Sequence, residues 1–126
     1  MDIQKSIHEA YGASKSYPEL VKKLIDIGVQ SYTVEVASST ILYRLKDGEN
    51  ILHTEVHTPR EIAATFNEQQ TVQAIRDNQA GKTDYPGFMD AIAKAGVRLY
   101  EATLNGGNKR VTYIGTGGFY EERIPL

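Results

Sequence analysis

The segment YPELVKKLIDIGVQSYTVEV, residues 17–36, decides the fold, because YPGFMDAIAKAGVRLYEATL, residues 85–104, repeats it 68 positions later. The two segments share Tyr-Pro at their start, Gly-Val in the middle and a tyrosine three residues after that valine. The identical pairs are Tyr17/Tyr85, Pro18/Pro86, Gly28/Gly96, Val29/Val97 and Tyr32/Tyr100. Self-similarity at a fixed spacing indicates a repeated structural unit. The sequence therefore predicts an internal duplication.

Each copy has the pattern of a helix followed by a strand. Ser16 and Asp84 precede the two copies and are residues that cap helix N-termini. Gly28 and Gly96 follow the last apolar positions of helical spacing, where glycine readily ends a helix in the left-handed conformation. Alternation with a period of two begins after each glycine and predicts a half-buried strand.

The pattern extends on both sides of these segments. We expect opening helices near 3–13 and 68–79, second strands led by Ile41 and Val111, and third strands near 50–57 and 118–124. Thr58-Pro59-Arg60-Glu61 has the form of a capping box with proline at the first helical position, which predicts a short helical connector over 58–67.

Two tandem helix–helix–three-strand repeats follow from this reading, at about 3–57 and 68–124. We expect them to form a single α+β domain spanning 1–126, with an antiparallel sheet and the helices packed on one of its faces. The interpretation would fail if the strands formed a parallel sheet with crossover helices.

The amino-acid composition excludes several classes of protein. The chain has 126 residues, is 40% hydrophobic and 24% charged, contains no cysteine and carries a formal charge of −2. Disulfides and thiol chemistry are excluded, and the balanced charge gives no indication of nucleic-acid binding. The start of the sequence lacks the apolar stretch of a secretory signal, and no apolar run is long enough to span a membrane. We therefore expect a cytoplasmic protein that does not bind membranes.

His53, Glu55 and His57 are the candidates for a metal site. Alternate residues of a strand share a face, and two imidazoles with a carboxylate can bind zinc or iron. The equivalent positions of the second copy, Arg123 and Pro125, do not repeat the set. Leu52, Thr54 and Val56 form a plausible buried face, so we favour a polar, solvent-facing strand face over a metal site.

Tyrosines recur at matching strand positions of both copies: Tyr32, Tyr43, Tyr100 and Tyr113. The first interpretation is an amphipathic core in which each hydroxyl reaches a polar edge. The second is a tyrosine-lined groove between the two halves that holds a ligand. We favour the core and keep the four tyrosines as ligand-binding candidates.

The second copy resembles the YdfO-like family through a set of short motifs. These are Gly81-Lys82-Thr83-Asp84-Tyr85, Phe88, Ala95-Gly96-Val97, Val111-Thr112-Tyr113, Gly118 and Ile124-Pro125. Members are small bacterial proteins, often encoded by prophages and sometimes labelled phage envelope protein. The family is uncharacterised, so the resemblance implies a fold and no activity.

These observations favour a non-enzymatic binding or interaction module without a cofactor. No catalytic residues are indicated. The alternative is a small metal-dependent enzyme that uses His53, Glu55 and His57. The third strand, 51–57, is less protected by charge than 118–124, and exposed strand edges pair with other chains. We therefore expect a homodimer through the 51–57 edge, with an unidentified protein or small molecule as a further partner.

Overall fold

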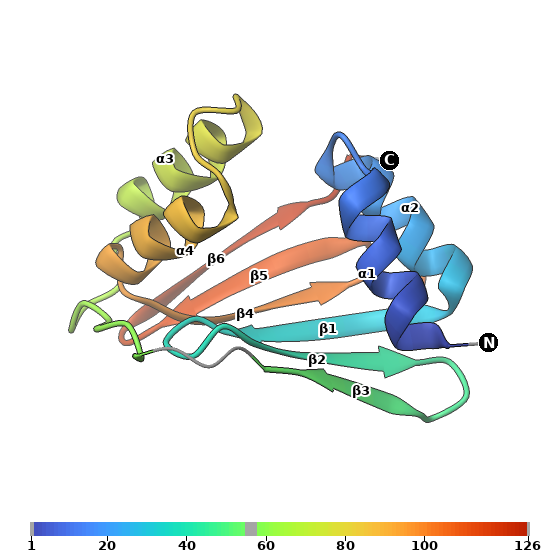
Figure 1. Ribbon diagram of the computed structural model, residues 1–126. Helices are drawn as coiled ribbons and strands as arrows, with labels where there is room; N and C mark the ends of the chain where they lie inside the picture. The colour runs from blue at the N-terminus through green and yellow to red at the C-terminus, as the bar shows by residue number, and fades with distance from the viewer. Residues whose placement is uncertain (1, 55–57, 126) are drawn as a thin grey trace.

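The computed structural model describes residues 2–54 and 58–125 (Figure 1). The first half contains two helices and three strands: α1 (Ile3–Ala13), α2 (Tyr17–Ile27), β1 (Val29–Glu35), β2 (Thr40–Leu45) and β3 (Asn50–His53). The second half repeats this order: α3 (Glu68–Gln79), α4 (Tyr85–Lys94), β4 (Val97–Thr103), β5 (Arg110–Gly115) and β6 (Gly118–Arg123). The predicted α+β class and the repeated helix–helix–three-strand pattern are confirmed.

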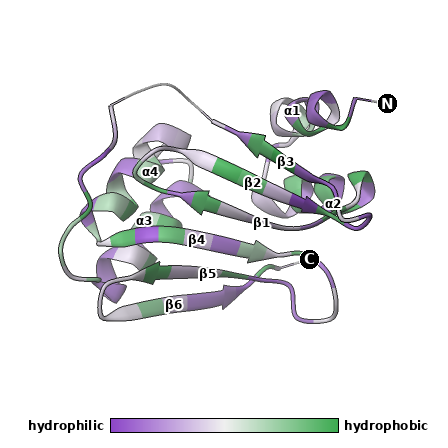
Figure 2. Cartoon of the chain, turned by 90° about the horizontal axis from the view of Figure 1, so that it is seen from below, coloured by the Kyte–Doolittle hydropathy of each residue, from purple (hydrophilic) through white to green (hydrophobic). Residues whose placement is uncertain are grey.

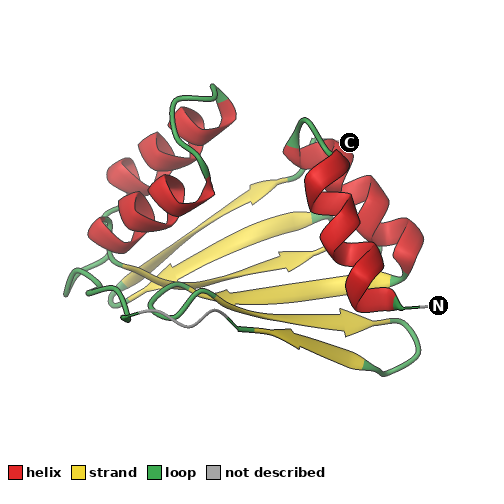
Figure 3. Cartoon of the chain, viewed as in Figure 1, coloured by secondary structure: helices red, strands yellow, loops and turns green. Residues whose placement is uncertain are grey.

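All six strands form one antiparallel sheet in the order β3-β2-β1-β4-β5-β6. The helices lie on one face, as two pairs over the two halves of the sheet (Figures 1 and 3). Across residues 2–54 and 58–125, no helix is long and apolar enough to cross a membrane.

The two halves join at the centre of the sheet through β1 and β4. Thr33 pairs with Glu101, the residue 68 positions later that is its own counterpart in the repeat. A local two-fold axis therefore passes between Thr33 and Glu101. Both central strands also shift register at the same place, between Val29 and Ser31 in β1 and between Val97 and Leu99 in β4.

The helix ends follow the predicted chemistry. The Ser16 hydroxyl accepts a hydrogen bond from the Glu19 N–H at 3.3 Å, and the Asp84 carboxylate accepts one from the Gly87 N–H at 2.9 Å. The Glu19 carboxylate reaches back to the N–H of Lys15 at 3.0 Å. Gly28 adopts a φ of 110° and Gly96 a φ of 86°, so both predicted left-handed positions are confirmed.

The predicted helical connector is wrong. Residues 58–67, all of which are described, contain no helix. Their backbone N–H groups donate to carbonyls of other elements instead. Arg60 donates to Ala37, and Ala63 donates to Ala93. These tertiary hydrogen bonds satisfy donors that a helix would have satisfied locally, so the capping-box pattern at 58–61 is overridden.

Arg60 fastens the connector to both halves. Its guanidinium donates to the Ser39 hydroxyl and to the Asp90 carboxylate, both at 2.7 Å, and to the Val36 carbonyl at 3.2 Å. Ser39 belongs to the first half and Asp90 to α4 of the second. Further along, the N–H of Asn67 donates to the Ala95 carbonyl at 2.8 Å. The connector therefore binds to the end of α4 before α3 begins.

No helix of the described residues lies on the other face of the sheet, and Figure 2 views the molecule from this side. Its centre is polar: Arg44 lies 3.7 Å from Glu101, and Arg110 lies 3.4 Å from Glu121. In the four inner strands, β2, β1, β4 and β5, the side chains that face the helices are mainly aliphatic or tyrosine and are buried, so the hydrophobic core lies in the single layer between the sheet and the helices.

We predict unequal costs for alanine at the two left-handed glycines. A Cβ at Gly28 would meet only the flexible side chain of Lys46, at 3.6 Å. A Cβ at Gly96 would collide with the backbone carbonyl of Thr65. Gly28→Ala should lower the free energy of unfolding by about 1 kcal/mol through its φ alone. Gly96→Ala should cost about 3 kcal/mol because overpacking adds to the strain.

Denaturant unfolding of the two variants checks this difference. Gly12→Ala is the control, because no atom lies within 4 Å of its added Cβ. Equal midpoints for the Gly28 and Gly96 variants would contradict the close packing of the connector against Gly96.

Candidate functional site

A helix tyrosine contacts a strand tyrosine in each repeat. The hydroxyls of Tyr17, at the start of α2, and Tyr32, in β1, lie 2.5 Å apart. Their counterparts Tyr85, at the start of α4, and Tyr100, in β4, also share a side-chain hydrogen bond. The pair thus ties the start of the second helix of each repeat to the first strand.

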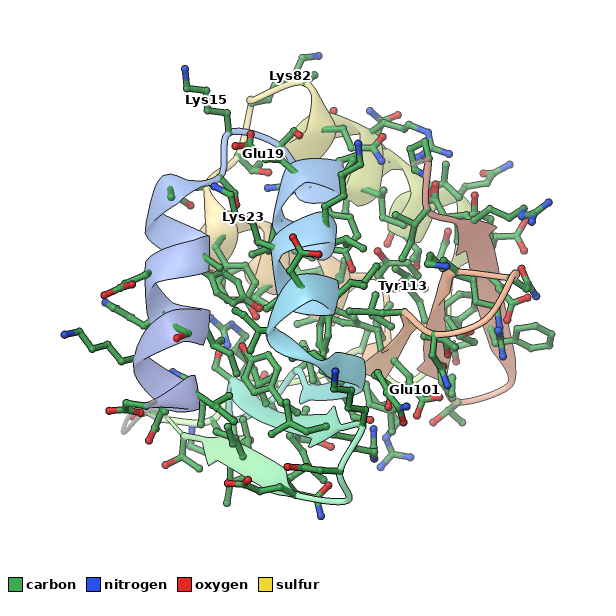
Figure 4. All side chains as sticks on the ribbon, turned by 90° about the vertical axis from the view of Figure 1, so that its right-hand side faces the viewer. Lys15, Glu19, Lys23, Lys82, Glu101 and Tyr113 are labelled. Atoms are coloured by element: carbon green, nitrogen blue, oxygen red, sulfur yellow. The ribbon has the colours of Figure 1, made fainter. Side chains whose placement is uncertain are left out.

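The four tyrosines of the sequence candidates lie on the helix-covered face and are 3–6% exposed. The structure brings them together as neighbours: the ring centroids of Tyr32 and Tyr43 are 5.7 Å apart, and those of Tyr100 and Tyr113 are 5.3 Å apart. Figure 4 shows Tyr113 in the interior of the fold.

Burial raises the pKa values of the strand tyrosines and of their helix partner Tyr17. It raises the pKa of Tyr17 to about 12, against an opposing contribution from the hydrogen bond with Tyr32. It likewise raises the pKa of Tyr43 to about 12, opposed by the hydrogen bond to Tyr11. Burial is also the main cause that raises the pKa values of Tyr32 and Tyr100 well above their ordinary range. All four phenols are therefore neutral at physiological pH.

A pocket of about 640 Å³ lies between α1 and the β2–β3 side of the sheet. Its apolar lining comes from Ile7 and Tyr11 of α1, Ile41 and Tyr43 of β2, and Ile51 of β3. The Tyr43 hydroxyl donates to the Tyr11 hydroxyl at 3.0 Å within it. The second half contributes Tyr85, and the remaining lining residues are polar: Asp2, Gln4, Lys5, His8 and His53.

The same place in the second repeat is filled. Arg76 is the counterpart of His8, and Glu122 occupies the register position of His53. The Arg76 guanidinium and the Glu122 carboxylate form an ion pair at 2.9 Å. Tyr120 takes the position of Ile51 and stacks on Tyr113 with centroids 6.4 Å apart. The pocket is therefore a divergence between the repeats and not a necessary consequence of the fold.

The predicted orientation of the third strand is wrong for the residues that can be described. Leu52, expected in the core, is 58% exposed on the uncovered face of the sheet. His53, expected to face solvent on the polar side, pairs with Ile41 and lines the pocket on the helix side. The reason is the register, because Ile51 pairs with Tyr43 and His53 with Ile41, which places both side chains toward the helices.

The metal candidates are only partly described. Glu55 and His57 lie outside the described residues. Among the residues that are described, no group of three or more His, Cys, Asp or Glu side chains could hold a metal ion. The metal-dependent enzyme therefore has no support within this part of the chain.

Sequence analysis missed most residues of the pocket. Of its four tyrosine candidates, only Tyr43 lines the cavity, whereas His8, Tyr11 and Tyr85 were not singled out. A usable signal was present in the repeat itself. Aligning the copies shows where they differ in size and charge, as at Tyr11 against Gln79, and the pocket lies where such differences gather.

Comparison with known protein families matches residues 5–118 to DUF1398, described as a protein of unknown function. The chain belongs to this family, which is uncharacterised. The YdfO-like resemblance and the phage association remain predictions. No curated protein matches the chain significantly.

We predict that the fold loses stability as the buried tyrosines ionise. A phenol whose pKa is raised in the folded state contributes stability that is complete below the unfolded pKa of about 10. That stability is lost as the pH rises toward the folded pKa of Tyr17 and Tyr43, about 12. Guanidinium unfolding at pH 8 to 11, followed by circular dichroism, should therefore give midpoints that fall only above about pH 10.

Phenolate absorbance at 295 nm provides the second measurement. Tyr17→Phe is the control, because it removes one raised pKa and should make the alkaline decline shallower. Full ionisation of all eight tyrosines near pH 10 without loss of the near-ultraviolet signal would contradict the burial of Tyr32, Tyr43, Tyr100 and Tyr113.

Proposed function

We propose that this protein is a non-enzymatic binding module that takes a small, largely apolar molecule in the pocket between α1, β2 and β3. The observation that carries the proposal is the difference between the repeats. Tyr120 and the Arg76–Glu122 ion pair fill the position in the second half that remains a cavity in the first.

The size and lining of the cavity support this function. Ligand pockets typically measure about 300–1,000 Å³ and combine an apolar wall with a few polar groups. Here isoleucine and tyrosine side chains form the wall, and the polar residues belong mainly to α1. Tyr85 closes the pocket from the second half, so the site depends on both repeats.

The experiment is to fill the cavity with the residue that the second repeat uses. Ile51→Tyr should abolish binding of 4-phenylbutanol and 4-phenylbutyrate while the protein still folds. The unaltered protein should bind at least one of these probes with a Kd of about 1–10 mM, as expected for eleven or twelve non-hydrogen atoms. Chemical-shift titration of the labelled protein measures both Kd and location.

Leu52→Tyr is the matched control. It adds the same side chain to the neighbouring position of β3, which is exposed on the uncovered face. Binding should survive this change. If neither probe shifts pocket resonances, or if both tyrosine variants bind as the parent does, the pocket is not the binding site.

Self-association through β3 is a second candidate. Within the described residues, β3 has a strand neighbour only in β2, and Leu52 is largely exposed beside that open edge. We predict that light scattering at tens of micromolar detects twice the 14.0 kDa mass of the chain. Thr54→Pro should reduce this mass to the monomer, because proline removes a backbone donor.

Circular dichroism controls for folding of the Thr54→Pro variant. A parent protein that scatters only as a monomer, or a folded Thr54→Pro variant that stays dimeric, would exclude this edge. A cytoplasmic location and a prophage origin remain proposals from the sequence, independent of both experiments.

A further inference from the structure

We infer that the ligand of this pocket is an amphipathic anion, whose negative head group lies at Lys5, His8 and His53 and whose apolar body lies against the isoleucine and tyrosine wall. This inference rests on the proposed binding function and specifies the chemical class of the ligand.

The groups that can carry charge lie on two of the contributing elements. The segment containing α1 supplies Asp2, Lys5 and His8, and β3 supplies His53. The contributions of β2 and α4 are Ile41, Tyr43 and Tyr85, which are uncharged at neutral pH. Among the described lining residues, one lysine and two histidines therefore face one carboxylate.

That carboxylate is already engaged with the protein. Asp2 is the N-cap of α1 and accepts a hydrogen bond from the Lys5 N–H at 3.2 Å. A negative group at a helix N-terminus is also favoured by the dipole of the helix. Asp2 is thus offset by α1 itself, whereas the described residues form no ion pair with the ammonium of Lys5, which lines the same pocket.

The second repeat shows what replaces a ligand at this position. Arg76 and Glu122 carry opposite charges and hold α3 against β6 directly. Their counterparts His8 and His53 are alike in charge type, so they cannot form this ion pair. An anion placed between them can accept hydrogen bonds from imidazole N–H groups, as Glu122 accepts hydrogen bonds from Arg76 in the other half.

The apolar part of the ligand has a defined direction. Six residues separate Lys5 from Tyr11 on α1, which corresponds to about 9 Å along the helix axis. Tyr11 and Tyr85 are 38% and 40% exposed, so both rings offer surface to a ligand. A molecule with a charged end and a chain or ring of comparable length matches this separation.

Three probes with the same body and different head groups test the inference: 4-phenylbutyrate, 4-phenylbutanol and 4-phenylbutylamine. We expect the acid to bind about fivefold or more tightly than the alcohol, and the amine to bind weakest, because a charge-assisted contact adds to the shared apolar burial. Titrations contain EDTA so that a trace metal cannot bridge the carboxylate to histidine.

Variants identify the head-group site. Lys5→Gln and the double variant His8→Gln/His53→Gln should each remove most of the advantage in Kd that the acid has over the alcohol. These side chains are exposed, so folding should be retained. Lys82→Gln is the charge-matched control, since Lys82 points into solvent from the loop between α3 and α4 (Figure 4).

The outcomes distinguish failure of the anionic ligand class from failure of the proposed binding function. Acid preference that Lys5→Gln removes and Lys82→Gln preserves supports the inference. Equal binding of the acid and the alcohol, or a preference for the amine, overturns the anionic class and leaves the binding function standing. Absence of binding by all three probes overturns the proposed function and the inference with it.

Discussion

Antiparallel pairing of β1 with β4 is the contact on which the rest of the structure depends. Each repeat alone is a three-stranded sheet with two edges, and the inner edges, β1 and β4, pair with one another around Thr33 and Glu101. The pairing brings Val34 and Tyr100 side by side beneath the helices. One sheet with a continuous core results, and the connector then fastens α4 to the β1–β2 turn through Arg60.

Local patterns predicted the fold well because they agreed with the tertiary structure. Each local pattern predicts one backbone segment: Tyr-Pro after a capping residue begins a helix, glycine ends it, and alternation marks the strand. The duplication repeats all three patterns in the second half of the chain. The connector was mispredicted for the opposite reason. Its N–H groups donate to the carbonyls of Ala37 and Ala93. A local sequence pattern does not predict a hydrogen-bond partner so distant in sequence.

The site was less accessible than the fold. His53 was singled out for its chemistry but placed on the wrong face, because a strand as short as β3 does not define its own orientation. Its register is set by Ile51 facing Tyr43. Tyr32 and Tyr100 recur because both pack in the core of their own half. Choosing site candidates by their recurrence therefore selected core residues. The pocket consists largely of residues that do not recur.

The difference between the recurring core residues and the non-recurring pocket residues shows how a duplicated fold can acquire a binding site in one half. A two-fold arrangement requires the positions near the β1–β4 axis to remain compatible with one another, whereas the positions beneath α1 and α3 meet no counterpart and can diverge. In the second repeat Tyr120 stacks on Tyr113 and Arg76 binds Glu122, which are contacts that stabilise the half containing them. In the first repeat the counterpart positions hold Ile51, His8 and His53, which line a cavity. A sheet stabilised across its centre tolerates that cavity at one side, so one half can supply stability while the other presents a binding surface.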